Sequence, residues 1–146
     1  MFLHELNDDQ REAFMCLAAR LASADAHLED DELEMLSLMR HEMDIPPTWR
    51  PSTASTPELL ARFTDHRRQT IVLLELLRLA RVDQAVADRE RTFFFEAATA
   101  FRFSKKQIQD LLQWVRRHEV LMAEAEKLLK PPLSRIRMPP PPGRDA

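Results

Sequence analysis

The sequence predicts an all-α protein, a compact bundle of about six to seven helices, from three observations. Helix-favouring residues, namely Ala, Leu, Met, Glu and Arg, dominate the composition, whereas Tyr is absent and strand-forming residues are few. The only glycine is Gly143, near the end of the chain, so the turns are expected to need no positive φ angle. Apolar residues also recur at intervals of three and four through most of the chain.

The first two helices are delimited by polar caps and prolines. Asn7, Asp8 and Asp9 supply N-cap oxygens, and Glu12 follows Asp9 at capping-box spacing, so a first helix is predicted from about Asp9 to Ala24. A second helix is predicted over residues 30–43, since its apolar residues share one side. Pro46-Pro47 is expected to end it.

Residues 46–56 form a Pro-rich connection that is predicted not to be helical, because three prolines remove backbone donors. Trp49 within it is expected to fold onto the core as a clasp. Thr56 and Pro57 are interpreted as the N-cap and first residue of a short third helix that reaches about Phe63.

The fourth helix, predicted over residues 67–82, is apolar around much of its circumference and should therefore be central. Glu75 inside it needs a partner if it is buried, and Arg78 or Arg20 would serve. A fifth helix is predicted over residues 88–101.

The sixth helix is predicted to start after a Ser104 cap and to continue to Lys130, unless it breaks near Arg117-His118. Its apolar residues recur at helical spacing: Ile108, Leu111, Leu112, Val115, Met122, Ala125 and Leu129. If continuous, it would be roughly 40 Å long at 1.5 Å per residue, longer than the core it packs on. Its distal end is expected to wrap back or to seek a partner. Residues 131–146 are Pro-rich and are predicted to be a disordered tail.

An acidic pattern occurs twice, with its copies 58 residues apart. Each copy joins two helices, and the copies are Asp25-x-x-Leu28-x-Asp30-x-Glu32 and Asp83-x-x-Val86-x-Asp88-x-Glu90. A loop aspartate and a glutamate seven residues later can converge where the chain reverses, and hard divalent cations such as calcium bind oxygen ligands of this kind. The candidate metal ligands are therefore Asp25, Glu32, Asp83 and Glu90, to which Asp30 and Asp88 can add.

The same acids have a structural alternative. Glu32 and Glu90 would sit near the third helical position and reach back to backbone donors, while Asp25 and Asp83 would accept from loop amides. Capping alone would then explain the pattern, and the EF-hand template does not fit it. Metal binding, capping and a protein-docking role all stay open at this point.

The duplicated pattern predicts two pseudo-repeats of helix, acidic loop, helix, helix within one domain, residues 1–130. Repeat one would cover residues 8–65 with the insertion 46–56, and repeat two residues 66–118. Residues 119–130 would extend the last helix beyond the second repeat.

The duplicated segments, Leu21 to Glu32 and Leu79 to Glu90, resemble a motif of the tellurite-resistance TerB-like domains, which also occur at the N-terminus of a membrane-anchored DnaJ-type co-chaperone. That motif is Leu-Ala-x-x-Asp-Gly-x-Ile/Val-x-x-x-Glu, and the resemblance covers roughly residues 8–115. It implies a bacterial all-helical protein, with divalent-metal binding through the acids and scaffolding in stress responses. Both family glycines are replaced here, by Ala26 and Gln84.

Other classes of function are disfavoured by the composition. The lone Cys16 permits neither an internal disulfide nor a zinc cluster, and no basic, apolar leader opens the chain, so a cytoplasmic protein is expected. The most apolar stretch, Thr70 to Ala80, is too short to span a bilayer. Scattered basic residues without an aromatic pattern argue against nucleic-acid binding.

The sequence therefore predicts a non-enzymatic module with an unidentified protein partner, and self-association is left open. The leading hypothesis is a TerB-like module that binds divalent metal through the acidic loops and acts in stress response or as a scaffold. The alternative is a structural adaptor whose acids cap helices and whose C-terminal helix and tail bind the partner.

Overall fold

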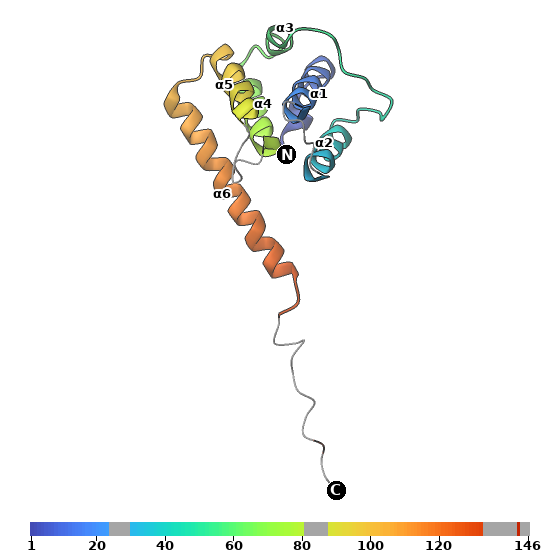
Figure 1. Cartoon of the computed structure of the whole chain (residues 1–146), viewed down its shortest axis with the longest axis vertical. Coiled ribbons are helices and arrows are strands. Elements are labelled where there is room, and N and C mark those ends of the chain that lie inside the picture. Colours follow the sequence, from blue (N-terminus) through green and yellow to red (C-terminus); the bar gives the residue numbers. More distant parts are fainter. Residues whose placement is uncertain (24–29, 81–87, 133–142, 144–146) are drawn as a thin grey trace.

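The structure, a computed structural model, describes residues 1–23, 30–80, 88–132 and 143, with only the backbone described for residues 30, 31 and 88–90 (Figure 1). Its elements are η1 (Leu3–Glu5), α1 (Asp8–Ser23), α2 (Asp30–Glu42), α3 (Thr56–Leu60), α4 (His66–Ala80), α5 (Asp88–Ala100) and α6 (Lys105–Leu129). All are helical, so the prediction of an all-α bundle is confirmed. No helix in the described ranges is both long enough and apolar enough to cross a membrane.

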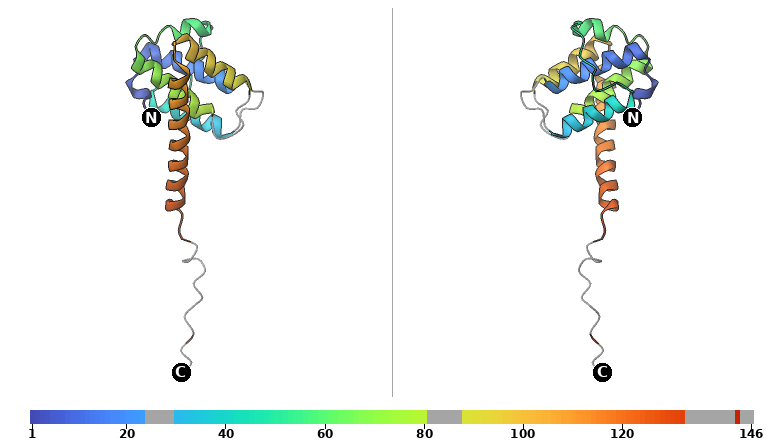
Figure 2. Two further views of the ribbon diagram at one scale, coloured as in Figure 1. Left: turned by 90° about the vertical axis from the view of Figure 1, so that its left-hand side faces the viewer. Right: turned by 90° about the vertical axis from the view of Figure 1, so that its right-hand side faces the viewer.

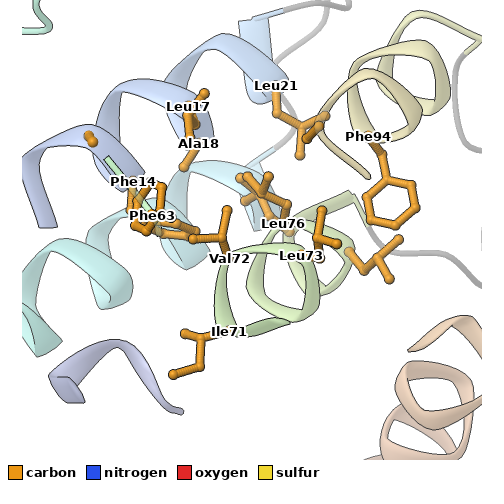
Figure 3. Packing of buried hydrophobic residues seen from close by; sticks show 14 of the residues in the cluster. Phe14, Leu17, Ala18, Leu21, Phe63, Ile71, Val72, Leu73, Leu76 and Phe94 are labelled. Atoms are coloured by element: carbon orange, nitrogen blue, oxygen red, sulfur yellow. The ribbon is translucent and has the colours of Figure 1, made fainter. Parts of the chain in front are cut away.

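Helix α4 lies at the centre of the bundle, as its apolar circumference predicts. It packs against α1, α2, α5, α6 and η1, and eight of its 15 residues are buried. Figure 3 shows where the side chains of α1, α4, α5 and the end of α3 meet, at Phe14, Leu17, Ala18, Leu21, Phe63, Val72, Leu73, Leu76 and Phe94. Burial of this apolar surface is the main stabilising term for the fold.

Reciprocal caps begin three of the described helices, α1, α3 and α6. At α6 the Ser104 hydroxyl accepts from the Gln107 N–H at 3.1 Å, and the Gln107 side chain accepts from the Ser104 N–H at 2.7 Å, which confirms the predicted cap. At α1 the same exchange joins Asn7 and Gln10. The predicted box at Asp9 is thus wrong by two residues, because the helix already starts at Asp8.

The cap of α3 is Ser55 and not Thr56, which corrects the sequence prediction. Ser55 accepts from the Glu58 N–H at 3.3 Å and donates its own N–H to the Glu58 carboxylate at 3.1 Å. The Thr56 hydroxyl instead accepts a hydrogen bond from Arg20 at 3.0 Å. Pro57 fits the first turn of the helix because it has no N–H to leave unsatisfied.

Two helices end on residues with positive φ, contrary to the expectation that this chain needs none. Asp44, after α2, has φ 56°, and Arg102, after α5, has φ 59°. At the first of these ends the Ile45 N–H donates to the Arg40 carbonyl at 3.0 Å, closing a Schellman-type turn. The chain adopts this geometry without glycine because the turn satisfies carbonyls at the helix end.

The Pro-rich connection before α3 is held against α1 by polar and apolar contacts. Arg20 donates to the Ser52 carbonyl at 3.3 Å, and the Ser52 N–H lies 3.3 Å from the sulfur of the buried Cys16. Trp49 packs half-buried against the core, which confirms the predicted clasp.

Glu75 is a fully buried carboxylate in the middle of α4. Arg78 donates to it at 2.7 Å, the Phe2 N–H donates at 3.0 Å, and the amino group of Met1 lies 3.0 Å away. Arg78 is therefore the partner expected from the sequence, whereas Arg20 is committed to the connection before α3. These donors compensate the cost of removing the charge from water.

Replacing Glu75 with Gln should lower the free energy of unfolding by about 3 kcal/mol, because the amide keeps the volume but leaves Arg78 without its counter-charge. Denaturant titration measures this loss. The exposed pair Arg67–Glu5 is the control, since Arg67→Ala should cost less than about 1 kcal/mol. A Glu75→Gln variant as stable as the wild type would show that the buried pair does not stabilise the fold.

Candidate functional site

The structure describes the side chain of one of the six candidate metal ligands. That residue is Glu32, which is buried. The other five lie outside the described residues or are described by backbone alone: Asp25, Asp83, Asp30, Asp88 and Glu90. Whether the two acidic loops converge on a metal therefore stays a prediction.

The acidic pattern lies on the same part of two helices. The described part of α2 begins at Asp30 and that of α5 at Asp88. The residues before them lie outside the described ranges, so the capping role of Glu32 and Glu90 stays a prediction. Within the described part of the chain, no group of three or more His, Cys, Asp or Glu residues is arranged to hold a metal ion.

Helix α6 divides into a packed half and a half that leaves the body. The predicted break near Arg117-His118 is absent, and the helix continues through Leu129. In its first half Ile108 and Val115 are buried and the helix packs on α4. Figure 2 shows the later turns standing clear of the other helices in both views.

The second half of α6 carries an apolar stripe, here called the distal face, composed of exposed Leu121, Met122, Leu128 and Leu129 around half-buried Ala125. The exposed fraction is 62% for Leu121, 86% for Leu128 and 78% for Leu129. Intervals of three and four place these residues on one side of the helix. Met122 and Leu129 continue the seven-residue spacing of Ile108 and Val115 beyond α4, and Leu121 and Leu128 lie beside them on one flank. Contiguous exposed apolar surface of a few hundred Å² is typical of docking sites.

Acidic residues border the distal face along both edges. Glu124 lies one turn from Leu121 and from Leu128 on one edge, because it is three residues after the first and four before the second. Glu126 lies one turn from Met122 and from Leu129 on the other edge, because it is four residues after the first and three before the second. Both glutamates are exposed.

His118 marks the boundary between the two halves of α6. Its ring stacks on Trp114, with the ring centres 5.2 Å apart and an interplanar angle of 16°. Burial lowers the pKa of His118 below 6.5, the positive charges of Arg78 and the Met1 amino group lower it further, and the carboxylate of Glu75 opposes them. The neutral imidazole is therefore the form that fits this contact.

Sequence periodicity found only part of the distal face. It placed Met122, Ala125 and Leu129 on the apolar side of the sixth helix but did not include Leu121 and Leu128. A second row, Leu121, Ala125, Leu128, repeats the same intervals and would have identified them.

Comparison of the chain with known protein families, with curated proteins and with solved structures finds no match. The resemblance to TerB-like domains therefore stays a prediction that rests on the two duplicated segments.

Lowering the pH should destabilise the wild type relative to a His118→Asn variant. Unfolded histidine takes up a proton near pH 6.5, whereas folded His118 resists it, so the stability present above 6.5 is lost as the pH falls through the lowered pKa. Urea unfolding of both proteins at about pH 7.5 and about pH 5 measures the difference. A difference that does not change with pH would contradict the assigned contact.

Proposed function

We propose that this chain is a non-enzymatic protein-interaction module, in which the helical body anchors α6 and the distal face binds a protein partner. The observation that carries the proposal is the exposure of this face, above all the 86% exposure of Leu128. A single exposed leucine is ordinary, but five apolar residues on one side of a protruding helix leave a surface that a partner would remove from water.

The anchoring of α6 supports this assignment. The helix starts at a reciprocal cap and is fixed to α4 through buried Ile108 and Val115. A helix held at one end presents its other end in a defined direction, which lowers the ordering cost of binding.

Site-specific crosslinking in cell extract tests the proposal. A photoreactive phenylalanine analogue in place of Leu121 or Leu128 should give protein adducts of defined mass. The same analogue in place of Ala123 is the matched control, because Ala123 is exposed and lies on the opposite side of the helix. Equal labelling from all three positions, or none from Leu121 and Leu128, would contradict the proposal.

A second candidate function is a TerB-like module that responds to a divalent cation through its acidic loops. It is supported by the duplicated acidic pattern itself, Asp25 to Glu32 and Asp83 to Glu90. Calorimetric titration with calcium, magnesium, manganese and zinc, beside an Asp25→Asn/Asp83→Asn variant, distinguishes it from a capping role. Metal binding that the variant lacks would support it, and no binding at millimolar metal would exclude it.

A further inference from the structure

We infer that the partner of the distal face is a basic amphipathic helix, one whose apolar side is bordered by Lys or Arg. The inference rests on the proposed function and specifies the chemistry of the partner.

The first half of α6 indicates which kind of element fits the stripe. There the same line of side chains, Ile108 and Val115, is covered by a helix of this chain, α4. Side chains at intervals of three and four form ridges that fit the grooves of a second helix. Met122 and Leu129 continue this line within the distal face, which spans residues 118–129, roughly 18 Å at 1.5 Å per residue, so a partner of about three helical turns would cover it.

The charges at its edges indicate what must flank the partner's apolar side. Glu124 borders one edge and Glu126 the other, both exposed. Lys127 lies towards the back of the helix, one turn from Ala123 and away from the stripe. Lys or Arg along the partner's edges would thus meet a carboxylate on either side, an arrangement that steers association and sets the partner's register.

The same edges disfavour a second copy of this chain as the occupant. In an antiparallel pair of α6 helices the Glu126 edge of one copy would face the Glu126 edge of the other. In a parallel pair it would face the Glu124 edge. Either direction sets acid against acid, which destabilises helix pairs.

Three synthetic helical peptides of about four turns test the inference. They share one leucine side and differ only in the residues that border it, which are Lys, Gln or Glu. Fluorescence anisotropy with the full chain should give an affinity for the Lys peptide at least about tenfold above that for the Gln peptide, and weaker binding still for the Glu peptide.

Two sets of variants assign that binding to the distal face. Glu124→Lys/Glu126→Lys should reverse the order, so that the Glu peptide binds best. Leu121→Ala/Leu128→Ala should weaken the Lys peptide at least about tenfold, since two exposed leucines no longer contribute apolar burial. Ala123→Gln, an exposed position on the opposite side, should leave the affinity unchanged. Circular dichroism and the unfolding midpoint of each variant show that α6 remains folded.

Three results would overturn the inference. The first is that the chain binds all three peptides equally or binds none of them. The second is that the Glu124→Lys/Glu126→Lys variant ranks the three peptides in the same order of affinity as the wild type. The third is a wild-type chain that sediments as a dimer and becomes monomeric in Leu121→Ala/Leu128→Ala. If crosslinks from Leu121 and Leu128 persist beside any of these, the proposed function stands and only the partner's chemistry is wrong. If the crosslinks are absent as well, both fail.

Discussion

The rest of the structure depends on the burial of α4. Its residues 71–80 are apolar on almost every side, so α1, α2, α5 and α6 must surround them to remove that surface from water. The one carboxylate inside it, Glu75, is tolerated because Arg78 and the Phe2 N–H supply donors.

Helices α4 and α6 differ in length. At 1.5 Å per residue α4 is roughly 22 Å long and α6, with 25 residues, is roughly 37 Å long. Helix α4 therefore covers only the first part of α6.

The features that local physics determines could be predicted from the sequence. The central position of α4 follows from its all-round apolar composition, and the Ser104 cap follows from a hydroxyl residue just before an apolar-periodic run. Choices between neighbouring residues could not be predicted. Ser55 and Thr56 are both good caps, and Ser55 is used because the Thr56 hydroxyl bonds Arg20 from α1, a tertiary contact. The positive φ at Asp44 and Arg102 likewise depends on how each helix end packs.

The candidate sites also combine features that the local sequence predicts with features that depend on the tertiary structure. The acidic pattern runs into α2 and α5, whose described parts begin at Asp30 and Asp88, and the residues that cap these helices stay a prediction. Its ligand geometry depends on how the loops are arranged in three dimensions, which spacing alone does not determine. The distal face was only partly predicted, since periodicity marks an apolar side without showing how much of it another helix covers. That depends on where α4 ends, and so the exposure of Leu121 and Leu128, unlike their spacing, is known only from the folded structure.

Hydrogen exchange along α6 tests most directly whether α4 holds only its first half. Amides of residues 109–117 should exchange with a free energy close to that of global unfolding, whereas amides of residues 121–129 should open locally at far lower free energy. Exchange rates should therefore step near His118, where burial ends. Uniform protection through Leu129 in the isolated monomer would contradict this account, because it would mean that the distal face is already covered.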